Sequence, residues 1–287
     1  MMSFSIIQDQ ISAAVVGGAL PTLSQNLVAR FALPVPPTRA EQDAIAEALS
    51  GVEALIESLE QLLNKKRQIK QGAVHELLTG TKRLPGFSGA WEVKPLDAIA
   101  FVTSGKRLPL GCFLADSETP HPYIRVTDMR PGTVSLADLK FVPKNVFPFI
   151  KQYRIYKDDI FISVAGTLGV VGKIPPELDG ANLTENADRI TNITCSQEFL
   201  LQVMMAPPIK DTIESLQTVG AQPKLALARI RKFDIPLPPS RVEQEAIASV
   251  LTDIDASIAA ISTKLAKARA LKQGMMQELL TGRIRLV

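Results

Sequence analysis

The sequence predicts an α+β protein in which one mixed α/β domain is joined to two long helices paired as an antiparallel coiled coil. Three observations lead to this prediction. The chain contains one stretch twice, each copy has helical periodicity, and the segment between the copies alternates β-rich runs with turn residues.

The repeated stretch occupies residues 33–84 and returns at residues 235–286, at a constant offset of 202 positions without a gap. Of the 52 aligned positions 25 are identical, which indicates an internal duplication. The period is too long for a solenoid. We therefore expect two matched helical arms with one domain inserted between them.

Each copy has helix-start and helix-stop signals with a continuous apolar seam between them. Prolines and a Thr/Ser-x-x-Glu capping box, which ends at Glu41 and at Glu243, mark the starts. Gly80 and Gly282 suit left-handed caps at the ends. Apolar residues recur between these signals with the heptad spacing of a coiled coil: Ile45, Leu49, Val52, Ile56, Leu59 and Leu63, then Ile247, Leu251, Ile254, Ile258, Ile261 and Leu265.

A helix of about 40 residues is about 60 Å long, and a single helix of this kind would leave its apolar stripe in water. We therefore expect the two copies to pack on each other. A structural hairpin with no further role is the alternative interpretation.

The duplication extends into the first residues of the chain, where Gly18-Ala19-x-Pro21 matches Gly220-Ala221-x-Pro223. The first residues thus resemble the closing segment of a domain whose main body is missing from this chain. The predicted division is a domain remnant over residues 1–32, a first helical region over 33–87, the inserted domain over 88–234 and a second helical region over 235–287.

The inserted domain has five β-rich runs bounded by Pro, Gly or Asp turns, which predict a mixed, mostly antiparallel sheet. These runs are residues 98–102, 123–126, 140–142, 159–164 and 189–194. A helix fits residues 197–205, and a second one fits residues 208–218. The domain has 17 basic and 16 acidic residues, so an electrostatic binding surface requires clustering on one face.

Composition favours an ordinary globular protein, with 46% hydrophobic residues, 21% charged residues and a net charge of +3 over 287 residues. Cys112 and Cys195 lie far apart without metal-ligand spacing, which favours a reduced, cytoplasmic setting. We find no apolar run of transmembrane length and no signal-peptide pattern at the N-terminus, and so expect no membrane partner.

Motifs of known catalytic chemistry are missing from the sequence. It has no GxGxxG loop after a strand, no P-loop, no HExxH and no GxSxG. The two histidines, His75 and His121, are interpreted as a helix-face residue and a loop residue rather than ligands. We therefore predict that the chain is not an enzyme and needs neither cofactor nor metal.

Three short polar loops are candidate contact sites, although a generic loop is the alternative for each. Arginine can bind guanine through two hydrogen bonds, while Ser, Thr, Lys and glycine amides typically hold phosphates. The candidate residues are Thr103, Ser104, Gly105, Lys106, Arg107, Arg125, Thr127, Asp128, Arg130, Ser163, Gly166 and Thr167.

The doubled pattern PxPPxxEQxAIA…KQG…ELLTGxxRL resembles the conserved regions of Type I restriction–modification specificity subunits. The segment between the copies is similar to one target recognition domain of that family. The stretches that carry this similarity are residues 103–105, 123–128, 159–172 and 220–223, and the resemblance covers essentially the whole chain. Lys106-Arg107-Leu108 stands before Pro109 where the family often has a shorter turn.

The resemblance implies a subunit that reads one half of a split site in double-stranded DNA and performs no chemistry itself. Its helices would act as a spacer and would dock a modification (methyltransferase) subunit, with a restriction/translocase subunit joining for cleavage. The family pattern has two recognition domains, so we expect two copies of this chain to act together as a homodimer. The alternatives are a structural adapter without sequence preference and an enzyme with an unrecognised site.

Overall fold

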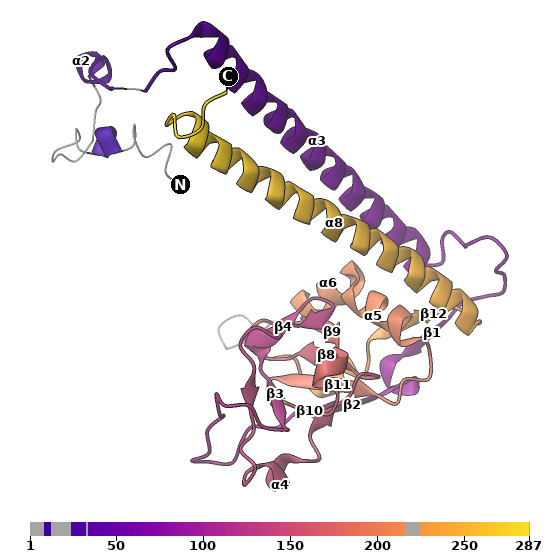
Figure 1. Ribbon diagram of the computed structural model, residues 1–287. Helices are drawn as coiled ribbons and strands as arrows, with labels where there is room; N and C mark the ends of the chain where they lie inside the picture. Colours follow the sequence, from indigo (N-terminus) through magenta and orange to yellow (C-terminus); the bar gives the residue numbers. More distant parts are fainter. Residues whose placement is uncertain (1–8, 13–23, 33, 216–223, 287) are drawn as a thin grey trace. The chain divides into compact units, whose positions relative to one another are not determined.

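The computed structural model describes residues 9–12, 24–32, 34–215 and 224–286 (Figure 1). The chain forms two compact units. One consists of residues 1–69 and 254–287, and the other of residues 70–253. Leu33 and the matched motifs at residues 18–21 and 220–223 lie outside the described residues. The division of the sequence into regions 1–32, 33–87, 88–234 and 235–287 stays a prediction.

The first unit is built on an antiparallel pair formed by parts of two long helices, α3 (Arg39–Leu78) and α8 (Arg241–Leu279). The ion pairs between the two helical regions show that the helices run antiparallel. Successive glutamates along α3 pair with residues progressively earlier in the second copy: Glu41 with Arg285, Glu53 with Lys272 and Glu60 with Arg269. A hydrophobic cluster joins the two helices through Val52, Ile56, Leu59, Leu63, Ile258, Ile261, Leu265 and Ala268. The predicted antiparallel pairing is confirmed.

The two copies of the repeat form the same ion pair twice, once in each unit. Arg285 binds Glu41 through Nε and Nη2 in the first unit. At the matching positions of the second unit, Arg83 donates to the two carboxylate oxygens of Glu243 at 2.5 and 2.7 Å. In both cases the arginine at the end of one copy neutralises the capping-box glutamate at the start of the other.

The seam of the second copy departs from the prediction at its beginning. Ile247 and Leu251 are buried in the core of the second unit, together with Leu77 and Leu78 of α3. Only the later part of this seam packs against α3 in the first unit. The inserted domain thus takes over apolar positions that heptad spacing alone assigns to a coiled coil.

Helix α8 also corrects the expectation that no apolar run reaches transmembrane length. By length and composition it is the one described helix apolar enough to cross a membrane. Residues 246–263 contain only two charged residues, Asp253 and Asp255. The helix is this apolar because it contributes to two hydrophobic cores. Ile247 and Leu251 are buried in the core of the second unit, and Ile261 and Leu265 pack in the helix pair of the first unit.

The described residues of the second unit, 70–215 and 224–253, form two four-stranded sheets and two short strand pairs (Figure 1). One sheet has the order β6-β3-β10-β7 and is mixed, since β10 runs parallel to β3 but antiparallel to β7. The other has the antiparallel order β2-β11-β8-β9. The pairs β1–β12 and β4–β5 are antiparallel as well.

The strands of this unit are β1 (Glu92–Pro95), β2 (Phe101–Ser104), β3 (Pro122–Ile124), β4 (Met129–Arg130), β5 (Thr133–Val134), β6 (Lys140–Phe141), β7 (Arg154–Ile155), β8 (Ile160–Ser163), β9 (Val171–Lys173), β10 (Ala181–Leu183), β11 (Ala187–Thr191) and β12 (Asp234–Leu237). The helices are α4 (Phe147–Ile150), α5 (Gln197–Met205), α6 (Pro207–Ser215) and α7 (Leu227–Ile230), with 3-10 turns η1 (Leu96–Ala98), η2 (Val126–Asp128) and η3 (Pro176–Leu178). Each of the five predicted β-rich runs overlaps a strand, and the predicted helix over 197–205 is α5.

Buried side chains form three clusters within this unit. The largest covers the β2-β11-β8-β9 sheet with α5, α6 and the ends of the long helices that lie in this unit. A second lies between the two four-stranded sheets and includes Ile124, Phe161 and Leu183. A third, around Tyr123, Val146 and Ile150, supports α4, which lies at the far end of the unit from α5 and α6 (Figure 1). These clusters fix the loops described below.

The described part of the N-terminal segment repeats the local structure of its second copy. Helix α2 (Gln25–Val28) occupies the positions that match α7 (Leu227–Ile230). Burial differs, because Val28 is 50% exposed whereas the matching Ile230 is fully buried in the core of the second unit. The matched positions thus form a helical turn in both copies, although none of the four residues is identical and their burial differs.

Candidate nucleic-acid interface

The three predicted contact loops converge on the connection between β10 and β11, residues 184–186. From the first loop, the Lys106 amide donates to the Leu183 carbonyl at 2.8 Å. The Thr184 amide donates to the last carbonyl of β3 at 3.1 Å, which ties in the second loop. Two amides that follow β8 donate to the Asn186 carbonyl at 2.8 and 3.3 Å, which ties in the third. Loops far apart in sequence therefore meet at one place.

Gly105 allows the first loop to approach this connection closely. Its backbone is buried, and its amide donates to the Ala187 carbonyl at 3.0 Å. A Cβ added at Gly105 would lie 2.1 Å from the Thr184 carbonyl oxygen and 2.4 Å from that of Leu183. Only glycine fits this position. Gly105 is therefore needed for the packing of the loop, in addition to its predicted role as a contact residue.

Thr103 and Ser104 face partners on β11. The Arg189 guanidinium donates to Thr103 Oγ1 at 2.8 Å, and the Ser104 hydroxyl donates to Asp188 Oδ1 at 2.6 Å. Asp188 is buried, and burial raises the pKa of its carboxyl group. Both hydroxyls thus fix the end of β2 against β11.

Lys106 and Arg107 are exposed, and they carry the positive charge of the first loop. Arg107 forms an ion pair with Glu185 at 2.8 Å while 77% of its own side chain stays accessible. Burial acts to raise the pKa of Glu185, but hydrogen bonds from Arg107 and neighbouring groups outweigh it and leave this pKa lowered. Arg107 is therefore held in place with its guanidinium open to a ligand.

In the second loop, Arg125 and Asp128 bind each other. Asp128 is buried, and it accepts hydrogen bonds from the Arg125 amide and guanidinium at 2.7 to 3.0 Å. Together with Asp138, it raises the pKa of the Arg125 guanidinium. Arg130 donates to backbone carbonyls at Thr127 and Met129, and both Thr127 and Arg130 are exposed. The residues of this loop that remain open to a ligand are thus Thr127 and Arg130.

In the third loop, Ser163 is fully buried and shapes the turn. Its hydroxyl donates to the Thr167 carbonyl at 2.5 Å and accepts from the Val170 amide at 2.8 Å. Gly166 and Thr167 are exposed at the tip, where Gly166 has φ of 77°. Surface contacts of this loop therefore fall to Gly166 and Thr167, while Ser163 positions them.

Sequence reasoning missed a basic surface beside the first loop. Residues 103–115 and 140–157, which meet in the cluster around Val146 and Ile150, contain seven basic residues and no acidic residue. Two of these, Arg107 and Lys140, pair with acidic side chains. No ion pair is formed, among the described residues, by the other five: Lys106, Lys144, Lys151, Arg154 and Lys157. The run of five cations over 140–157 was the available signal.

Tyr123, a buried residue of β3, anchors the first loop. Its hydroxyl donates to the Lys106 carbonyl at 3.0 Å, and burial raises the pKa of the phenol to about 12. The folded protein therefore keeps this proton above pH 10, where the unfolded chain releases it. The stabilisation is complete below pH 10 and is lost as the pH rises towards 12.

We expect the free energy of unfolding to fall by about 2 kcal/mol between pH 10 and pH 12 because of Tyr123 alone. Urea unfolding of the wild type and of Tyr123→Phe, followed by Trp91 fluorescence, measures this difference. The two proteins should differ in pH dependence only in this range. Parallel curves from pH 8 to 12 would contradict the assignment.

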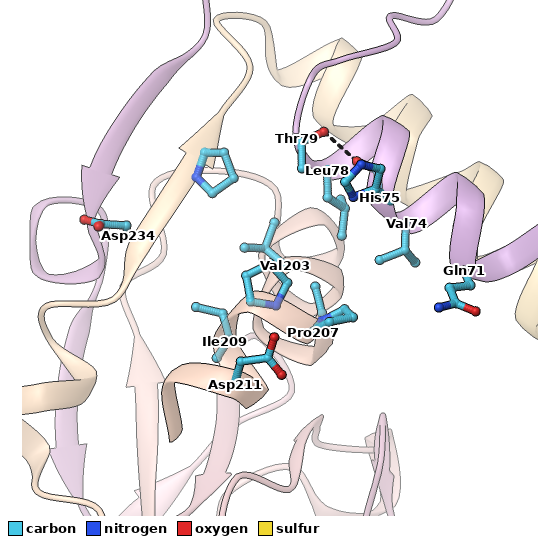
Figure 2. Close-up of a pocket in the computed structure, with 13 residues that line it drawn as sticks. Gln71, Val74, His75, Leu78, Thr79, Val203, Pro207, Ile209, Asp211 and Asp234 are labelled. Atoms are coloured by element: carbon cyan, nitrogen blue, oxygen red, sulfur yellow. Dashed lines mark hydrogen bonds between the residues drawn. The ribbon is translucent and has the colours of Figure 1, made fainter. Parts of the chain in front are cut away.

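A cavity of about 400 Å³ lies elsewhere in the same unit, between the end of α3, the α5–α6 junction and β12 (Figure 2). Val74 and Leu78 face Val203, Pro207 and Ile209 across it. This lining is mostly hydrocarbon, which suits an apolar group better than a phosphate. Among the residues that the structure describes, no cluster of three His, Cys, Asp or Glu side chains suits a metal ion.

The described part of the chain is an α+β protein with a mixed-sheet domain and long helices. The chain belongs to the family of the type I restriction modification DNA specificity domain, whose model matches residues 89–269. The predicted family is confirmed.

Individual relatives agree with this family. The chain is 22% identical to the MjaVIII specificity subunit of Methanocaldococcus jannaschii over 99% of its own length and 69% of the relative. It is 23% identical to the EcoBI specificity subunit of Escherichia coli over 91% of its own length and 60% of the relative. The chain thus spans 60% to 69% of the length of these proteins.

Solved structures of low sequence identity share the fold. The S subunit of a type I restriction–modification system from M. genitalium matches with a TM-score of 0.63 and 18% identity, over 97% of this chain and 71% of that one. The HsdS subunit from Thermoanaerobacter tengcongensis matches with a TM-score of 0.58 and 16% identity, over 98% and 68%. The predicted combination of a mixed domain and long helices is confirmed.

Proposed function

We propose that this chain is a DNA sequence-recognition subunit of a type I restriction–modification complex and reads one half of a split target site. The observation that carries the proposal is the meeting of three polar loops, together with four cations without acidic partners among the described residues, on the first loop and on the segment around α4: Lys106, Lys144, Lys151 and Arg154. Such an arrangement binds phosphates through lysine and presents arginine to base edges.

In this proposal the chain performs no catalytic step and works in the cytoplasm. The paired parts of α3 and α8 form a stiff rod, which can dock a modification (methyltransferase) subunit and fix a distance along DNA. A restriction/translocase subunit joins the complex for cleavage. Two copies of the chain supply two recognition domains and read the two halves of the site.

Changing Lys144 and Lys151 together to alanine should make DNA binding by the complex less dependent on salt. Each phosphate contact releases condensed counterions, so the slope of log affinity against log salt should decrease by about 2. Fluorescence anisotropy of a labelled duplex, with the methyltransferase subunit present, measures this slope. The matched control is Lys210→Ala on α6, at the far end of the unit from α4 (Figure 1).

An unchanged slope in the double variant would contradict this interface. Binding of the methyltransferase subunit without any DNA sequence preference would favour the structural adapter instead. Light scattering on the same samples counts the chains in each complex, and a single copy under all conditions would refute the homodimer.

A further inference from the structure

The loop that follows Arg107 holds two large apolar side chains in water. Leu110 is fully exposed, with 105% relative accessibility, and Phe113 is 81% exposed. Leu110 lies inside a tight turn over residues 109–112, in which the Cys112 amide donates to the Pro109 carbonyl at 3.0 Å, and Phe113 follows this turn directly. Gly111 has φ of 81°, the left-handed conformation that a type II turn requires at its third position. Leu110 therefore stands at the tip of the turn.

This turn is anchored on both sides, so the exposure of its apolar residues is built in. Lys106 is tied at one end through its amide and carbonyl, and Ala115 pairs with Phe141 of β6 at the other. Leu108, Cys112 and Leu114 pack on the cluster around Val146 and Ile150. The same segment thus buries three apolar residues and presents two others outward.

Cations lie on the segments that adjoin this turn, although the exposed Asp116 and Glu118 follow it in sequence. Lys106 and Arg107 precede it directly in sequence. Burial lowers the pKa of the His121 imidazole, and the nearby positive charges of Arg154 and Lys144 lower it further. The His121 ring stacks on the ring of Phe147 of α4, with 3.5 Å between the ring centroids. Phe147 in turn packs on the same cluster as the anchors of the turn. An exposed apolar tip next to basic segments is complementary to DNA.

We propose that the turn over residues 109–113 is an apolar wedge, which inserts Leu110 and Phe113 at a base step of the DNA and partly unstacks it. This inference rests on the proposed function and adds a positioning element to it. Apolar wedges flanked by arginine and lysine are a recurring means of kinking DNA. Protein interfaces are instead depleted of lysine, so a protein partner fits this surface less well.

The test compares the wild type with the double variant Leu110→Ala, Phe113→Ala, each in the complex with the methyltransferase subunit. The DNA is a duplex that carries the sequence methylated by the wild-type complex, with 2-aminopurine placed at each purine in turn. Wild-type binding should raise the fluorescence at one step away from the methylated adenine, and the double variant should abolish this rise. Affinity should fall roughly ten- to a hundredfold.

Phe101→Ala is the matched control, because Phe101 is 66% exposed and stands at the opposite end of β2 from the loop. It should leave the fluorescence and affinity unchanged. A fluorescence rise retained by the double variant, or none in a wild-type complex that binds and methylates, overturns the wedge. Loss of methyltransferase binding in the double variant would identify a protein contact and also overturn it. Failure of the wild-type complex to bind any duplex would instead refute the proposed function.

Discussion

Replacing Arg83 by alanine should lower the free energy of unfolding of the sheet-containing unit by about 3 kcal/mol. Glu243 is 1% exposed and would lose the guanidinium that holds both of its oxygens. Arg83 also donates to the carbonyls of Ser88 and Gly89 and lies 5.8 Å from the Trp91 ring. The substitution therefore leaves a buried carboxylate unpaired and releases the start of the inserted domain.

Urea unfolding followed by tryptophan fluorescence measures this loss directly, because Trp91 is the only tryptophan and lies beside Arg83. The duplication supplies a matched control in Arg285→Ala, which breaks the same ion pair in the other unit; because Trp91 lies outside that unit, both variants are also followed by the circular dichroism of their helices. The Glu41 side chain is 5% exposed, but its partner Arg285 is 54% exposed, so removing Arg285 opens Glu41 to water, and we expect a smaller loss than for Arg83→Ala. Equal effects of the two substitutions would show that burial does not distinguish the two copies.

Much of the helical architecture could be predicted from the sequence because it depends on local and periodic signals. Capping boxes and heptad spacing predicted both long helices and their antiparallel pairing. The use of Ile247 and Leu251 in the sheet core could not be predicted in this way, since periodicity identifies an apolar face but not its partner. The apolar composition of α8 also depends on this packing in two separate cores, which periodicity does not show.

The candidate site was predictable only in part. Polar loops after strands indicated residues 103–107, 125–130 and 163–169, and the structure brings all three loops to the β10–β11 connection. The meeting point itself, residues 184–186, depends on β10, a short strand whose parallel neighbour β3 is far away in sequence. Which polar residues are buried was also not predictable, because local hydrogen bonds hold Asp128 and Ser163 but their burial depends on how the whole domain packs.

Gly105→Ala should destabilise the same unit by about 3 kcal/mol and abolish selective DNA binding. The added methyl group would overlap two backbone carbonyl oxygens, at 2.1 and 2.4 Å, so the loop or the β10–β11 connection must move. That movement also breaks the hydrogen bonds from the amides of Gly105 and Lys106, each of which contributes about 1 kcal/mol.

Gly72→Ala is the contrasting substitution for this prediction. Gly72 lies inside α3 with no atom within 4 Å of an added Cβ, so alanine should stabilise the unit by about 0.5–1 kcal/mol. Opposite signs for the two glycines in urea unfolding are the expected result. Wild-type stability with impaired DNA binding in Gly105→Ala would show that the loop adapts, and that Gly105 serves contact with DNA rather than packing. Because only the packing explanation requires both properties to fail together, measuring stability and DNA binding on the same variant decides between them.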